Sequence, residues 1–312
     1  MENISIVIPC YNVESNIIKC IDSIKNQTYK SFNCYLVDDG SKDNTAIFIK
    51  ETIKNDDRFV YVYKENGGQA SARNLGIDLS KTKYITFIDS DDYIHPDYLL
   101  KLYAPFVEQK NIQLSACFFE RIYEDKVSLN DFNEIDLYLS KYPAVWGKMF
   151  SLDLIKKENL KFPVGLWYED LCFFTQYMNF VTKVSVVKDN LYYYIQNPNS
   201  TMYTYSDKIY DIFEIFNILK TDIKDKERLE YIMIYHILIG TIFRISFKTN
   251  FNQNEIKEIM EKFNSEYSTW NKNKYIRKCM PLFYQVYLFF LSKGNYYLIY
   301  CLLSKLNKFV SL

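Results

Sequence analysis

The stretch that decides the fold is YITFIDSDD, residues 84–92. Its first five residues are apolar, aromatic or β-branched, which predicts a buried strand ending near Ile88. Three aspartates and one serine follow directly. An Asp-x-Asp turn at the rim of a strand offers two carboxylates to a divalent cation and the phosphates that complete its shell. The same residues would also suit a solvated acidic turn before the helix that begins near Pro96. The turn alone therefore does not show that a metal binds here.

Strand and helix patterns alternate in the residues before this stretch. Strands are predicted at 4–9, 32–37 and 59–63, and helices at 43–54 and 69–80. A further helix after the first strand repeats Ile17, Cys20, Ile21 and Ile24 on one face. This alternation predicts an α/β fold with a mainly parallel, Rossmann-like sheet and right-handed crossovers.

Polar residues follow three of these strands at their carboxyl ends: Tyr11-Asn12, Asp38-Asp39-Gly40-Ser41 and the acidic turn at 89–92. Ligands of open α/β sheets bind beyond the carboxyl ends of the strands. We therefore expect the three clusters to meet at one edge of the sheet. Gly67-Gly68 precedes a helix that carries Arg73. Glycines at this position would let a diphosphate approach the helix N-terminus, but they are equally common at the start of helices that bind no ligand.

The pattern changes after the first hundred residues. A helix is predicted at 96–109 and a strand at 112–122, and residues 129–200 are mixed. Helices are predicted at 209–219, 227–247 and 255–263. The apolar segment 281–303 is divided by Lys293-Gly294-Asn295, so two packed helices or helices on a membrane surface are expected, not a spanning helix. We expect a catalytic domain at 1–205, with a nucleotide-binding half at 1–95 and an acceptor half at 96–205. A helical region follows at 206–312.

Composition excludes several functional classes. Formal net charge is zero, which argues against a nucleic-acid binder. Seven scattered cysteines and two histidines make a disulfide framework or a histidine-based metal site improbable. No signal peptide is apparent, which predicts a cytoplasmic protein. Seven basic residues and no acidic one lie between Asn271 and Leu312. That tail suits either the inner face of the cell membrane or a helical bundle that packs or forms a homo-oligomer.

Four motifs taken together resemble the inverting GT-A glycosyltransferases of family 2, of the bacterial polysaccharide and glycoconjugate type. They are SIVIPCYN (5–12), VDDGS (37–41), GQASARNLG (68–76) and FIDSDD (87–92), and they occur in this order. Trp146-Gly147-Lys148 and Glu169-Asp170 resemble later motifs of that family. The resemblance covers roughly residues 3–200.

The resemblance implies a role for each matching residue. Asp170 would be the general base, and Asp91 the main ligand of Mn²⁺ or Mg²⁺. The nucleotide-sugar would contact Pro9, Tyr11, Asn12, Glu14, Asp39, Gly68, Arg73, Asn74, Asp89 and Ser90. The pocket for the donor sugar or the acceptor would be lined by Trp146, Lys148 and Glu169. The third protein ligand of the metal cannot be placed, and Glu169-Asp170 also suits the start of a helix.

The resemblance implies transfer of a sugar from a UDP-sugar to a hydroxyl of a saccharide, a lipid-linked saccharide or a glycoprotein glycan. Two alternatives remain open. A sugar nucleotidyltransferase would use the same sheet edge, but its Gly-rich basic loop is replaced here by Tyr11-Asn12-Val13-Glu14. The second alternative is a non-catalytic protein that binds nucleotide-sugars or partner subunits.

Overall fold

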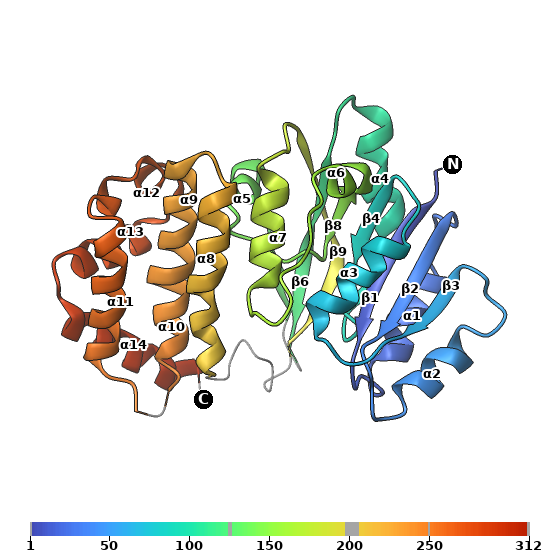
Figure 1. Cartoon of the computed structure of the whole chain (residues 1–312), viewed down its shortest axis with the longest axis horizontal. Helices are drawn as coiled ribbons and strands as arrows, with labels where there is room; N and C mark the ends of the chain where they lie inside the picture. The colour runs from blue at the N-terminus through green and yellow to red at the C-terminus, as the bar shows by residue number, and fades with distance from the viewer. Residues whose placement is uncertain (1, 124–126, 197–205, 249, 311–312) are drawn as a thin grey trace. The chain divides into compact units, whose positions relative to one another are not determined.

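The computed structural model describes residues 2–123, 127–196, 206–248 and 250–310, with side chains up to residue 305 (Figure 1). The chain forms two compact units. The first comprises residues 1–138 and 142–197, and the second comprises residues 139–141 and 198–312. The domain boundary expected at residues 205 and 206 adjoins the segment 197–205, which lies outside the described residues.

Four parallel strands form one half of the sheet in the first unit, in the order β3-β2-β1-β4. Their bounds are Ile4–Cys10 for β1, Phe32–Asp38 for β2, Phe59–Tyr63 for β3 and Tyr84–Phe87 for β4. The ends of each of these four strands differ from the predicted ends by no more than one residue. β1 is buried along its whole length, as expected of a central strand covered on both faces.

The other half of the sheet corrects the expectation of a mainly parallel arrangement. β8 (Lys148–Ser151) lies antiparallel between β4 and β6 (Leu114–Ile122). β9 (Val184–Ile195) runs parallel to β6, while β5 (Tyr93–Ile94) and β7 (Val127–Asn130) pair antiparallel with β9 and β6. The regular strand–helix alternation stops after residue 109, and β6 and β7 follow each other with no helix between them, as an antiparallel pair allows.

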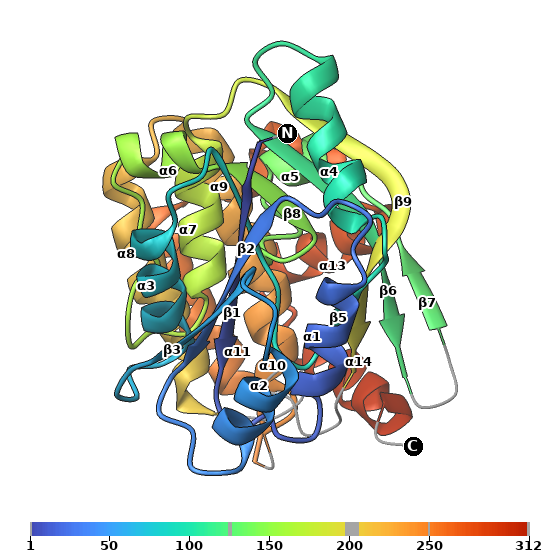
Figure 2. The same cartoon turned by 90° about the vertical axis from the view of Figure 1, so that its right-hand side faces the viewer.

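Helices cover both faces of this sheet (Figure 2). Their bounds are α1 Ile17–Lys25, α2 Thr45–Thr52, α3 Gln69–Leu79, α4 Tyr98–Glu108, α5 Glu134–Tyr138, α6 Leu152–Lys157 and α7 Glu169–Met178. Figure 2 shows α3, α6 and α7 on one side, with α1 and α4 on the other. The predicted apolar face of α1 is fully buried. The sheet with these helices therefore forms a single apolar core.

The second unit consists of helices in its described part. These are η1 Asp207–Tyr210, α8 Asp211–Asp222, α9 Lys226–Met233, the π-helical η2 Ile234–Thr241, α10 Ile242–Ile245, α11 Gln253–Glu266, η3 Trp270–Lys272, α12 Lys274–Cys279, α13 Leu282–Ser292 and α14 Tyr296–Val310. The predicted break at Lys293-Gly294-Asn295 is confirmed, with Gly294 at φ +71° between α13 and α14. Among the described residues, no helix is both long and apolar enough to span a bilayer.

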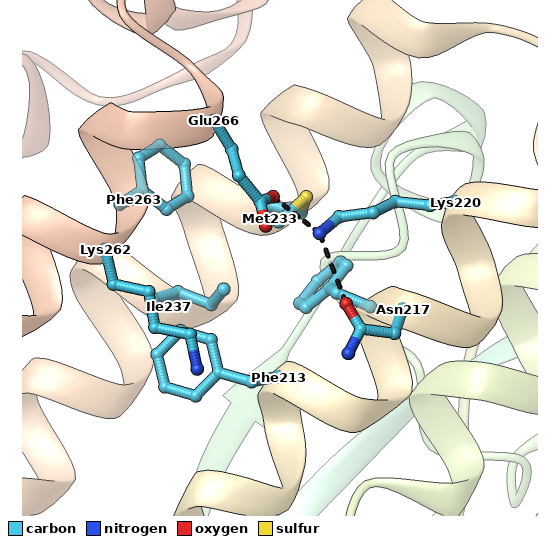
Figure 3. A pocket seen from close by; sticks show the side chains of 9 residues that line it. Phe213, Asn217, Lys220, Met233, Ile237, Lys262, Phe263 and Glu266 are labelled. Carbon is cyan, nitrogen blue, oxygen red and sulfur yellow. Dashed lines mark hydrogen bonds and ion pairs between the residues drawn. The ribbon is translucent and has the colours of Figure 1, made fainter.

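A small cleft opens on the helical unit between α8, α9, η2 and α11 (Figure 3). It is lined by Phe213, Phe216, Asn217, Lys220, Met233, Ile237, Lys262, Phe263 and Glu266. Lys220 forms an ion pair with Glu266, and the Nζ of Lys262 lies 3.8 Å from the centroid of the Phe213 ring. None of the residues predicted to bind substrate lies in this cleft.

Candidate functional site

Two loops at the carboxyl ends of β1 and β2 are tied together by short polar contacts. The backbone N–H of Asn12 donates to Ser41 Oγ at 3.1 Å, and Asn12 Oδ1 accepts from the N–H of Lys42 at 2.8 Å. Glu14 accepts from the N–H of Asn44 at 2.9 Å. Both side chains, predicted to contact nucleotide, thus join one loop to the other. Tyr11 directly precedes Asn12 and is half exposed.

The carboxylate of Asp39 lies at the entrance to α3. It accepts from the N–H groups of Gly67 at 3.0 Å and Gly68 at 2.7 Å, and it forms an ion pair with Lys64. Gly68 has φ +86°, a conformation that favours glycine. The loop after β2 is thereby held against the start of α3, so the predicted residues Asp39 and Gly68 are in direct contact.

Arg73 forms the centre of the site. It projects from α3 and is buried, and its guanidinium contacts three carboxylates: Asp89 at 2.8 Å, Glu169 at 3.1 Å and Asp170 at 2.7 Å. Gln69, one turn earlier on α3, also donates to Asp89 at 3.3 Å. An unbroken series of contacts therefore runs from Asp39 through α3 to Asp170.

Burial is the main influence on the pKa of the Asp170 carboxyl group. The carboxyl group is the second residue of α7, where a helix N-terminus favours negative charge. Burial nevertheless raises its pKa to about 7, although Arg73 lowers it, and the charges of Glu169 and Asp89 raise it further. A carboxyl group with a pKa close to neutral pH is suited to accept a proton from a substrate hydroxyl.

The acidic turn after β4 divides into a buried and an open part. Asp92 is buried and accepts from Tyr192 Oη at 2.7 Å and from the N–H of Ile195 at 2.8 Å. Asp91 is exposed, and no other described residue donates a hydrogen bond to its carboxylate. Desolvation by the surrounding chain, followed by the charge of Asp89, raises the pKa of Asp91 to about 6. Asp91 is thus the open carboxylate of the turn.

The residues present fit a divalent cation at this turn. Two hard oxygen ligands, Asp89 and Asp91, lie close enough that the charge of Asp89 raises the pKa of Asp91, and a bound cation would remove that cost. No set of three potential ligands from His, Cys, Asp and Glu occurs among the described residues. Mg²⁺ commonly takes one or two protein carboxylates and completes its shell with water and substrate phosphate, so two are sufficient.

Aromatic rings line the site beside the turn. Trp146 stacks on Tyr192 with ring centroids 4.6 Å apart, and on Tyr194 at 5.2 Å. Lys148, expected to line the same pocket, is buried on β8, where its Nζ donates to the carbonyl of Ala144. Burial lowers the pKa of Lys148 to about 8.

The remaining residues of the predicted set are Asn74, Pro9 and Ser90. Asn74 exchanges two hydrogen bonds with the backbone of Phe162, at 2.8 and 2.9 Å, and so fixes the segment that leads to α7. Pro9 and Ser90 are buried in β1 and in the acidic turn.

Lys64, Gln69 and Tyr192 belong to the site but were not predicted from the sequence. Lys64 and Gln69 flank Gly67-Gly68, and that position is the signal that could have found them. Tyr192 accepts from the N–H of Asp89 at 3.2 Å and donates to Asp92, across about a hundred residues of sequence. No local pattern could reveal that pairing.

Proteins similar to this chain include named glycosyltransferases. GlyA of Streptococcus pneumoniae, a glycosyltransferase, is 32% identical over 65% of this chain, and the chain covers only 30% of that protein. The structure of Staphylococcus aureus TarS 1–349 in complex with UDP-GlcNAc superposes with a TM-score of 0.69 at 20% identity, covering 88% of this chain and 87% of that one. The mannosyltransferase PcManGT of Pyrobaculum calidifontis, in complex with GDP-Man and Mn²⁺, gives 0.58 at 14% identity, covering 98% and 87%.

The structural likeness confirms the GT-A fold, including a mixed sheet followed by helices. The sequence model "Glycosyl transferase family 2" matches residues 5–161, about half of the chain and all four motifs at the sheet edge. The protein is therefore a member of glycosyl transferase family 2.

Proposed function

We propose that the protein transfers a sugar from a UDP-sugar to a hydroxyl of a saccharide, a lipid-linked saccharide or a glycoprotein glycan, with inversion at the anomeric carbon. The observation that carries this proposal is the placement of Asp170. Its carboxylate shares Arg73 with Asp89, and Asp89 is two residues from the open carboxylate of Asp91. A base for the acceptor and ligands for the donor thus belong to one cluster.

Each residue has a task in a single in-line displacement. Asp170 accepts the proton of the acceptor hydroxyl as its oxygen attacks the anomeric carbon. Arg73 keeps that carboxylate oriented and partly ionised. Asp91, with Asp89, would hold Mn²⁺ or Mg²⁺, which when bound neutralises the charge of the departing diphosphate. The Asp39 loop and the exposed ring of Tyr11 would receive the uracil.

The choice of nucleotide rests on these two residues. A carboxylate at Asp39 can accept the imide N–H of uracil, and Tyr11 offers a stacking face. The TarS complex contains UDP-GlcNAc, which supports this choice, whereas PcManGT contains GDP-Man. UDP-GlcNAc is therefore the first donor to test, beside other UDP-sugars and GDP-mannose.

The test measures nucleotide release from this donor panel with Mn²⁺, comparing the wild type with Asp170→Asn. Removal of a positioned base should lower turnover by roughly 10²–10⁴-fold, while UDP affinity by calorimetry stays the same. Asp153→Asn is a matched control, because Asp153 is likewise the second residue of a helix, α6, but is exposed and lies outside the site. If both variants keep wild-type turnover, Asp170 only stabilises its helix.

The same assay distinguishes a glycosyltransferase from a sugar nucleotidyltransferase. A sugar nucleotidyltransferase would release pyrophosphate from UTP and a sugar phosphate and would leave UDP-sugars intact.

Nuclear magnetic resonance of the transferred sugar should show the anomeric configuration opposite to that of the donor. Retention of configuration would contradict the single displacement.

A further inference from the structure

Helix α13 of the second unit carries an exposed apolar stripe. Leu282, Val286 and Phe289 recur at intervals of four and three residues, so they share one helix face. Their exposed fractions are 74%, 46% and 56%. Phe283, beside Leu282, is 64% exposed. Large apolar side chains gathered in this way are typical of an interaction surface.

Helix α14 repeats the pattern. Leu298 and Leu302 lie four residues apart on one face, and Tyr297 beside them is 67% exposed. α13 and α14 contact each other within the helical unit. Two neighbouring helices therefore present exposed apolar side chains, and we call this set of residues the α13–α14 surface.

Each stripe ends in a lysine. Lys293 follows Phe289 by four residues, and its Nζ lies 5.8 Å from the centroid of that ring. Lys305 follows Leu302 by three residues and is exposed. Arg277 and Lys278 are exposed just before α13. Among the described side chains, none of these four cations forms an ion pair with a carboxylate, unlike Lys274, which pairs with Glu227.

Charge distinguishes between two occupants for this surface. No acidic residue occurs between positions 271 and 312. A two-fold contact with a second copy would place the same surface against itself. Lysines would then meet lysines with no carboxylate in that segment to balance them. An anionic bilayer supplies both missing partners, since its headgroups are negative and its acyl region accepts leucine and phenylalanine.

We propose that the α13–α14 surface docks on a membrane that contains anionic phospholipid. The helices lie on the bilayer and do not cross it, in agreement with the absence of a long enough helix among the described residues. The docking itself does not depend on the proposed sugar transfer. Its consequence does, because a transferase held at a membrane surface would meet lipid-linked acceptors there.

The test is flotation of the full chain with vesicles of phosphatidylcholine alone or mixed with phosphatidylglycerol. The wild type should float with the mixed vesicles only, and less at high salt. Phe289→Glu should abolish flotation. Val107→Glu is the matched control, because Val107 is 66% exposed on α4 of the first unit. The double variant Lys293→Gln, Lys305→Gln should bind more weakly, by about fivefold for each lysine removed.

Folding is checked for every variant by circular dichroism and thermal melting, and UDP release reports the other site independently. Failure of the wild type to float with mixed vesicles would overturn the proposal. The proposal would also be overturned if Val107→Glu lost as much flotation as Phe289→Glu. A wild type that is dimeric by light scattering, fails to float and becomes monomeric in Phe289→Glu would assign the surface to a second copy instead.

Discussion

Arg73 decides the electrostatics of the candidate site. One buried guanidinium faces three carboxylates, so the cluster carries excess negative charge when all of them are ionised. Because a buried charge without a partner is costly, one of the three carboxylates holds its proton more tightly than in water. Asp170 is that group, with its pKa near 7. Arg73 therefore tunes Asp170 and joins it to Asp89 on the donor side.

Replacing Arg73 should move the pH dependence of activity. Burial raises the pKa of Asp170 and Arg73 opposes this rise, so Arg73→Gln should raise that pKa by about 1–3 units. A base works when deprotonated, and the rising limb of kcat/KM against pH should therefore shift to higher pH. Arg73→Lys should shift it less, because the charge remains.

Arg58→Gln is the control for this measurement. Arg58 also pairs with an aspartate, Asp56 at 2.7 Å, but lies apart from the site, so its loss should leave the pH profile unchanged. Circular dichroism verifies that each variant is folded. An unchanged midpoint in a folded Arg73→Gln would show that Arg73 does not tune the base.

Close packing of α3 on β1 places Arg73 at this point. A methyl group added at Gly76 would lie 2.3 Å from Cγ1 and 2.7 Å from Cγ2 of Val7, both on a buried central strand. Gly76→Ala should destabilise the protein by about 1–3 kcal/mol through overpacking. Val7→Ala makes room, so the double variant should lose less than the two single losses added together. Urea unfolding measures all three, and strict additivity would contradict a direct clash.

The π-helical segment η2 contains a histidine that should make the helical unit sensitive to acid. His236 Nε2 lies 2.8 Å from the carbonyl of Ser140, and burial lowers the pKa of the ring from 6.5 to about 4. The folded state thus disfavours the charged form, and stability present above pH 6.5 is lost as the pH falls toward 4. Between pH 7 and pH 5 the loss should be about 2 kcal/mol. In His236→Gln, urea unfolding should show a smaller loss; an equal loss would assign the acid sensitivity to other groups.

Regular elements were predictable where the sequence pattern is local. β3 and the buried face of α1 agree with the sequence pattern because four residues on a stripe, or five in a strand, suffice to define them. β9 was missed because the polar run Lys188-Asp189-Asn190 interrupts it, where the register against β6 shifts. The acidic loops could be expected at one edge from strand order alone. The pairing of Arg73 with Asp170 spans 97 residues, and no spacing rule reaches that far.

At the scale of the whole molecule, nucleotide and metal binding should appear as added stability. A ligand that binds only the folded state stabilises by about 2.7 kcal/mol at a concentration 100 times its Kd. Asp91 is costly without a cation, because desolvation and Asp89 oppose its ionisation. A cation bound beside Asp91 would lower that cost and would favour the binding of a diphosphate at the same place.

Thermal melting of Asp91→Ala tests this coupling. In the wild type, UDP with Mn²⁺ should raise the melting temperature more than the two ligands do separately. Asp91→Ala should melt at the same temperature as the wild type or higher without ligands, since a disfavoured charge is removed, and should lose the increment due to Mn²⁺. Asp57→Ala, at an exposed aspartate outside the site, should behave as the wild type. A full Mn²⁺ increment in Asp91→Ala would place the cation on other ligands, because the carboxylate that the turn leaves open would then have no part in holding it.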